Sequence, residues 1–196
     1  MSSRTKRTAC LKSTGVELHV YNRGVNQGTI FFKQEDYQAF IQLVHDALPG
    51  SGITILQFVL MPNHFHLVVK QAHPYDISAF MKRITEKHAK RINGLRRRSG
   101  HLFQSRYKIS RVPGPDALLH LSHYVPSNPV AAKLVKRPSD WPFSSMRDYL
   151  GSAVTGLVDV DPLLDLIGGR ERYLQFLKEY DSRGPDTVWK YLLKTA

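Results

Sequence analysis

Two histidines separated by a single residue are the first candidates for chemistry in this sequence. His64 and His66 lie in the apolar segment 61–70, and two residues at this spacing in a β-strand point to the same face. Neutral imidazoles placed side by side can bind one divalent cation. The same spacing also fits ordinary surface or capped histidines, so the pair alone is a weak signal.

Tyr124 and Asn128 form a second candidate pair. They are four residues apart, so their side chains share one face if a helix persists there. A phenol attacks a phosphodiester more readily when a nearby cation polarises the phosphate, and an amide oxygen is a suitable ligand for such a cation. Pro126 and Pro129 lie in this segment, and we expect them to kink or end the helix. Taken singly, Tyr124 is one of nine tyrosines and also fits a residue at the edge of the core.

The metal suggested by these residues is a hard divalent ion. Two histidines and the oxygen of Asn128 leave room for a phosphate oxygen and water, which fits Mg²⁺ or Mn²⁺. Structural zinc needs a closed set of four ligands, and Cys10 is the only cysteine. A lone cysteine cannot form an internal disulfide, so we expect a reducing cytoplasm; a regulatory thiol is the alternative.

The charge of the chain points to a polyanionic partner. Its 28 Lys and Arg against 16 Asp and Glu give a net charge of +12, which favours nucleic acid, with an acidic membrane surface as the alternative. We find no apolar run long enough to span a bilayer and expect no membrane partner and a cytoplasmic, nucleoid-associated protein. A solvated basic face is the other interpretation of each single residue. The candidate phosphate-binding residues are Arg4, Arg7, Arg23, Lys82, Arg83, Lys87, Lys90, Arg91, Arg96, Arg97, Arg98, Arg106 and Lys108.

The periodicity of the chain predicts an α+β fold. Alternating and helical patterns follow one another in the order strand, helix, hairpin, helix, strand, helix. This order favours an antiparallel sheet with helices on one face. The predicted strands are 16–22, 53–60, 64–70 and 101–112. The predicted helices are 35–48, 77–91 and one from Asp116 through Tyr124, followed by short helical stretches near 162–167, 171–180 and 186–194.

We expect three segments along the chain. Residues 1–15 are interpreted as a basic N-terminal arm, residues 16–150 as a catalytic domain and residues 151–196 as a helical C-terminal appendage.

Several motifs together resemble the HUH single-tyrosine transposases, and within them the REP-associated, IS200-like branch. The central matches are Met-Pro-Asn-His-Phe-His at 61–66, Tyr124, and Asn-Pro-Val at 128–130. Further matches are Tyr-Asn-Arg-Gly at 21–24, Gly-His-Leu-Phe-Gln at 100–104, Arg-Tyr-Lys at 106–108 and Trp-Pro-Phe-Ser-Ser at 141–145. The resemblance covers about residues 16–150. Pro126 departs from the pattern.

The resemblance implies a ferredoxin-like domain and a defined reaction. Tyr124 would nick single-stranded DNA, leaving a 5′-phosphotyrosine and a free 3′-hydroxyl, with a metal held by His64, His66 and Asn128. The implied partner is single-stranded DNA with hairpin structure, without a nucleotide cofactor, bound by a monomer or a homodimer. The alternatives are a non-catalytic DNA- or RNA-binding regulator on the same fold and a metal-dependent phosphodiesterase that uses water.

Overall fold

The computed structural model describes residues 3–152 and 155–183, which divide into two compact units. The first unit comprises the chain up to Ile55 together with Leu60–Arg111, and the second comprises Leu56–Val59 together with the chain from Val112 onward. The predicted segment boundaries at 15 and 150 remain a prediction.

The first unit is built on a four-stranded antiparallel sheet. The strands of this sheet are β1 (Val16–Arg23), β2 (Ile53–Met61), β3 (His64–Gln71) and β4 (Lys108–Arg111), in the order β2-β3-β1-β4. The middle of β2, Leu56–Val59, is grouped with the second unit. β1 pairs antiparallel with both β3 and β4. The strand order and the two intervening helices give the predicted ferredoxin-like α+β arrangement.

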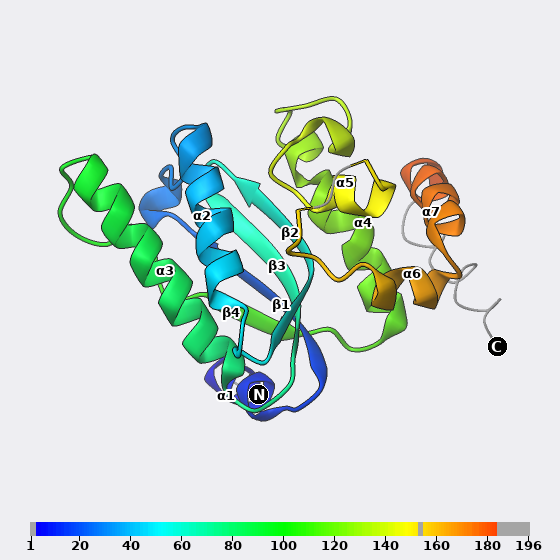
Figure 1. The fold of residues 1–196 in the computed structure, drawn as a ribbon, viewed down its shortest axis with the longest axis horizontal. Helices are drawn as coiled ribbons and strands as arrows, with labels where there is room; N and C mark the ends of the chain where they lie inside the picture. The colour runs from blue at the N-terminus through cyan, green and yellow to red at the C-terminus, as the bar shows by residue number, and fades with distance from the viewer. Residues whose placement is uncertain (1–2, 153–154, 184–196) are drawn as a thin grey trace. The chain divides into compact units, whose positions relative to one another are not determined.

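Helices α2 (Gln34–Ala47) and α3 (Asp76–Leu95) cover one face of this sheet, as Figure 1 shows. Their apolar stripes, at helical spacing, supply the core. Phe40 of α2 lies against Phe65 of β3 with 5.2 Å between ring centroids, and both are fully buried. Phe65 therefore fixes which face of β3 is turned toward the core.

The segment 3–12, expected as part of a basic arm, forms helix α1 (Ser3–Lys12). Cys10 is buried in it, and Arg7 donates to the backbone oxygen of Tyr107 at 2.8 Å. Helix α1 is therefore attached to the first unit.

The predicted strand 101–112 is wrong over most of its length, because only Lys108–Arg111 forms β4. Before β4 this segment makes one isolated antiparallel bridge, between Gly24 and Phe103, and oxygens on either side of the bridge accept hydrogen bonds from side chains. Asn93 donates to Gly100, and Asn22 donates to Ser105. Apolar alternation cannot reveal that the strand pairing of this segment is limited to the bridge and β4.

The described part of the second unit is mainly helical. It contains α4 (Pro115–Ala131), α5 (Met146–Leu150), α6 (Asp161–Ile167) and α7 (Arg170–Arg183), and a short 3₁₀ turn at Pro138–Asp140; a similar turn, Val25–Gln27, belongs to the first unit. The predicted helices near 162–167 and 171–180 are confirmed. The predicted stretch 186–194 lies outside the described residues.

Helix α4 does not end at its prolines, which were expected to kink or end it. Pro126 and Pro129 lack the N–H groups that would bond to the carbonyls of Ser122 and Val125. Two side chains donate to the Ser122 oxygen, Tyr173 at 2.9 Å and Gln57 at 3.4 Å, and Asn128 donates to the Val125 oxygen at 3.1 Å. Because these carbonyls have side-chain partners, the helix continues through both prolines.

No helix within residues 3–152 and 155–183 combines the length and apolarity needed to cross a bilayer.

Candidate active site

His64 and His66 lie side by side on the face of the sheet opposite α2 and α3. Phe65, between them, points toward α2, so the two histidines point the other way. Their ring centroids are 5.2 Å apart and the rings are nearly perpendicular. The strand alternation predicted from the sequence therefore brings the two imidazoles together.

The turn before β3 fixes the orientation of His64. Its Nδ1 lies 2.7 Å from the side-chain oxygen of Asn63, whose amide nitrogen donates to the backbone oxygen of Gln27 at 3.2 Å. An amide oxygen only accepts, so the proton of this hydrogen bond belongs to Nδ1 of His64. In the neutral ring the lone pair is then on Nε2, the nitrogen able to bind a cation.

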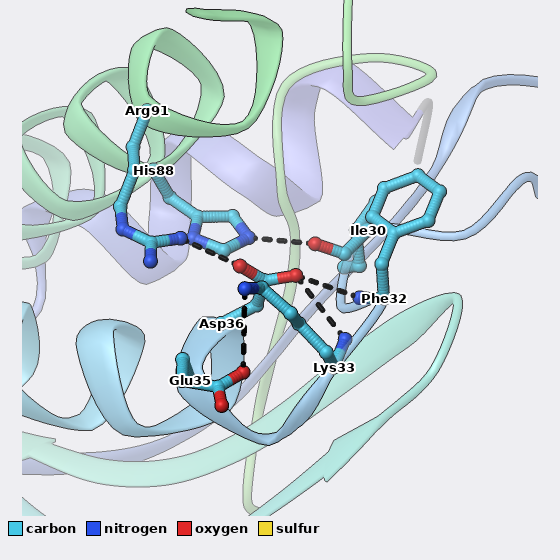
Figure 2. A network of polar contacts seen from close by, with 7 residues as sticks. All are labelled: Ile30, Phe32, Lys33, Glu35, Asp36, His88 and Arg91. Atoms are coloured by element: carbon cyan, nitrogen blue, oxygen red, sulfur yellow. Dashed lines mark hydrogen bonds and ion pairs between the residues drawn. The ribbon is translucent and has the colours of Figure 1, made fainter. Parts of the chain in front are cut away.

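A buried network supports this turn from the helical side. The backbone N–H groups of Ile30 and Phe31 both donate to the Pro62 oxygen, at 2.8 and 3.0 Å. His88 of α3 in turn donates from Nε2 to the Ile30 oxygen at 2.9 Å, as Figure 2 shows. Through Ile30, α3 therefore holds the turn that leads into His64.

Asp36 extends the same network to Arg91 (Figure 2). The buried carboxylate accepts from the Arg91 guanidinium at 2.6 Å and from the backbone N–H groups of Phe32 and Lys33. Burial raises the pKa of Asp36, but these hydrogen bonds and the Arg91 charge outweigh it and lower the pKa overall. Arg91, predicted to bind DNA, thus has a structural partner inside the first unit.

Both His66 and its neighbour His19 are held in the neutral form. Burial, followed by the nearby His19 and His64, lowers the pKa of His66 to about 3. Burial lowers the pKa of His19 to about 4. Neutral imidazole is the form that binds metal ions. His66 and the adjacent His64 therefore fit two positions of a divalent cation site by their placement. Among the described residues no cluster of three or more His, Cys, Asp and Glu forms a metal site, so further ligands would be of another type, such as an amide oxygen.

Tyr124 and Asn128 lie together on α4 in the second unit. The Tyr124 side chain is 43% exposed, which is unusual among the large aromatic residues described here. The Asn128 amide nitrogen donates to the backbone oxygens of Tyr124 and Val125, at 2.8 and 3.1 Å. Because its nitrogen is used in this way, the group that Asn128 can offer a cation is its side-chain oxygen.

Helix α7 is attached to the same stretch of α4. The Tyr180 hydroxyl is hydrogen-bonded to His120, and Asp181 pairs with His123 at 2.7 Å. The rings of His120 and Tyr124 are nearly parallel, with 6.3 Å between centroids. His120 and His123, which both precede Tyr124 on α4, therefore link its helix to α7.

Most of the predicted DNA-binding residues are exposed cations of the first unit. Several of the predicted residues also contact neighbouring groups. Arg7 lies over the Tyr107 ring, Arg96 over the Phe32 ring and Lys108 over the Tyr21 ring, and Arg23 donates to Gln104. The side chain of Arg4 lies outside the described residues. The exposed cations are Arg23, Lys82, Arg83, Lys87, Lys90, Arg96, Arg97, Arg98, Arg106 and Lys108.

A cavity of about 640 Å³ lies between α3 and the loop that replaces the predicted strand. Its lining includes three cations, Arg7, Lys82 and Arg106, with Asn22 and the 100–107 loop. A pocket of this size accommodates a small organic group such as a nucleotide. The cationic residues would suit an attached phosphate.

Two residues near the histidine pair were missed in the sequence analysis. Asn63 was treated only as part of a turn, although its position directly before His64 was a usable signal. His19 lies on β1, and only the pairing of Tyr21 with His66 reveals that it is close to β3. No local pattern could have identified it.

Comparison with known proteins identifies the family of this chain. The family model described as "Transposase IS200 like" matches residues 12–128, more than half of the chain. The solved structure of a REP-associated tyrosine transposase bound to a REP hairpin is 20% identical, with a TM-score of 0.60 over 75% of this chain and 84% of that chain. A structure described as a transposase from Deinococcus radiodurans R1 is 16% identical, with a TM-score of 0.43 over 58% and 90% of the two chains. The comparison with curated proteins finds no match.

The likeness to the REP-associated transposase shows the fold, which agrees with the ferredoxin-like sheet. The matched residues 12–128 contain His64, His66 and Tyr124 and end at Asn128. The chain therefore belongs to the family of IS200-like transposases.

Proposed function

We propose that this transposase cuts single-stranded DNA by direct attack of Tyr124 on a phosphodiester. The Tyr124 hydroxyl oxygen forms a bond to phosphorus and loses its proton to solvent, while the bond from phosphorus to the 3′ oxygen breaks and that oxygen takes up a proton from solvent. The products are a 5′-phosphotyrosine and a free 3′-hydroxyl. Because one phosphodiester replaces another, a 3′-hydroxyl can reverse the step and join strands without a nucleotide cofactor.

The observation that carries the proposal is the placement of His64 and His66 side by side on one face of the sheet, with 5.2 Å between their ring centroids. They would hold Mg²⁺ or Mn²⁺, with the side-chain oxygen of Asn128 as a third ligand. When bound, the cation supplies positive charge to the phosphate during attack. The exposed phenol of Tyr124 supports its assignment as the nucleophile.

The proposed substrate is DNA with a hairpin and a single-stranded flank. The hairpin is suggested by the REP hairpin bound to the structurally similar transposase. The flank would enter the cavity lined by Arg7, Lys82 and Arg106, where these cations would contact phosphates. Such contacts make affinity salt-dependent, and each contributes about 0.7 to the slope of log affinity against log salt for a single strand.

The test of the nucleophile is the formation of a covalent adduct. End-labelled hairpin oligonucleotides with single-stranded flanks are incubated with the protein and Mg²⁺ or Mn²⁺ and separated on a denaturing gel. We expect a protein-linked 5′ product that is lost in Tyr124→Phe, and a large loss in His64→Ala and His66→Ala. Tyr75→Phe is the matched control because Tyr75 is a similarly exposed tyrosine, at 49%.

Either of two results would contradict the proposal. Cleavage that persists in Tyr124→Phe without an adduct would identify water as the nucleophile and a metal-dependent phosphodiesterase. Hairpin binding without adduct or cleavage under any metal condition would identify a binding regulator.

The test of the cavity is the salt dependence of DNA binding. Lys82→Gln and Arg106→Gln are expected to lower the slope for flanked hairpins but not for hairpins without flanks. Lys178→Gln, which removes an exposed cation from α7, is the control. Equal slopes for all variants would refute the assignment of the flank to the cavity.

A further inference from the structure

His19 lies next to His66 although 47 residues separate them in the chain. Tyr21 pairs with His66 across β1 and β3, which places His19 on the same face and diagonal to His66. Nε2 of His19 is 2.8 Å from Nδ1 of His66, and the two rings are stacked with 5.1 Å between centroids. This is a direct hydrogen bond between two imidazoles.

This hydrogen bond determines which nitrogen of His66 can bind a cation. A neutral imidazole has one N–H and one lone pair, so the single proton in the bond belongs to one ring or the other. If Nδ1 of His66 donates, its lone pair is on Nε2. If Nε2 of His19 donates, Nδ1 of His66 is the acceptor and its Nε2 has the proton. Only the first arrangement makes Nε2 of His66 a metal ligand.

Asn63 provides the same kind of contact to His64. Its side-chain oxygen accepts the Nδ1 proton of His64, and the hydrogen bond from Asn63 to Gln27 fixes the amide orientation. In metal sites, hydrogen bonds of this kind orient the ligand rings and increase their basicity. Each histidine of the pair thus has a hydrogen-bond partner at Nδ1.

We propose that His19 is a positioning residue for the metal site, accepting the Nδ1 proton of His66 and so directing the Nε2 lone pair of His66 to a divalent cation. Stacking of Tyr21 on His66, with 5.5 Å between centroids, further restricts the ring. This inference rests on the proposed function for the cation, but it concerns residues of the first unit alone.

The first experiment measures the tautomer of His66 directly. Long-range ¹H–¹⁵N NMR of the metal-free protein with ¹⁵N-labelled histidine distinguishes Nδ1–H from Nε2–H, and His66→Gln identifies the signals. We expect the Nδ1–H form in the wild type and in His19→Gln, because the glutamine side-chain oxygen can replace Nε2 of His19 as the acceptor. A wild-type His66 protonated at Nε2 would overturn the proposal without the need for any variant.

The second experiment measures Mn²⁺ affinity by electron paramagnetic resonance. We expect His19→Leu to bind Mn²⁺ about 10- to 100-fold more weakly than the wild type, with most of the affinity restored in His19→Gln. His73→Leu is the control, because it removes an exposed imidazole. Unchanged Mn²⁺ affinity in His19→Leu would overturn this inference and leave the proposed cleavage intact. A wild type that does not bind Mn²⁺ would overturn the inference together with the metal role of the histidine pair, and DNA adduct formation would then be judged separately.

Discussion

Replacing His88 with glutamine should remove a defined part of the acid sensitivity of the fold. His88 is fully buried, and burial lowers its pKa to about 4 from an ordinary value of 6.5. Because the folded-state pKa is the lower one, the stability it provides is present above pH 6.5 and is lost as the pH falls toward 4. Linkage between these two values gives a loss of about 2 kcal/mol in unfolding free energy between pH 7.5 and pH 5.0.

The assay compares urea unfolding of the wild type and His88→Gln at these two pH values, followed by circular dichroism. The glutamine amide can still donate to the Ile30 oxygen, so the hydrogen bond of 2.9 Å has a replacement. Other buried histidines, such as His66, titrate in both proteins and cancel in the comparison. We expect the pH-dependent loss to be about 2 kcal/mol smaller in the variant. An equal loss in both proteins, or an NMR titration of His88 near 6.5, would refute the reasoning.

Two further changes test the polar contacts that hold each unit. Asp36→Asn removes the charge facing Arg91 at 2.6 Å and should lower the unfolding free energy by about 2 kcal/mol at pH 7. The difference in unfolding free energy between wild type and variant should shrink below pH 4 as the wild-type carboxylate becomes protonated. A constant difference from pH 7 to pH 3 would contradict this. Tyr173→Phe removes the 2.9 Å hydrogen bond to the Ser122 oxygen and should lower the unfolding free energy, measured with urea, by about 1 kcal/mol. An unchanged urea midpoint and slope would show instead that Gln57 alone satisfies that carbonyl.

The elements predicted well from the sequence are those with a strong periodic pattern. Helix α2, the β2–β3 hairpin and the start of α4 follow from helical or alternating apolar spacing and from turn residues such as Pro62. The loop 101–107 also alternates, but its Ser105 and Tyr107 carbonyls bond to the side chains of Asn22 and Arg7, which come from distant parts of the chain. Long-range partners of this kind leave no signal in a local window.

The placement of the two candidate metal ligands on one face was predictable from the sequence, but the residues around them were not. His64 and His66 share a face because strand alternation requires it. His19 comes next to them only through the register of β1 and β3, which the sequence does not specify by itself. The persistence of α4 beyond Pro126 depends on Tyr173, a residue 51 positions away from its partner Ser122.

Helix α4 is continuous from Pro115 to Ala131, but two of its backbone hydrogen bonds, those that Pro126 and Pro129 cannot donate, are missing near Tyr124. Two of its carbonyls, those of Ser122 and Val125, rely on the side chains of Tyr173, Gln57 and Asn128. Side-chain bonds can be broken without disturbing the neighbouring turns, so the free energy of local opening should be lower here than in α3, whose interior contains no proline. The segment carrying Tyr124, the proposed nucleophile, can therefore fluctuate as a small independent opening unit, with its amide protons exchanging ahead of the rest of the helix.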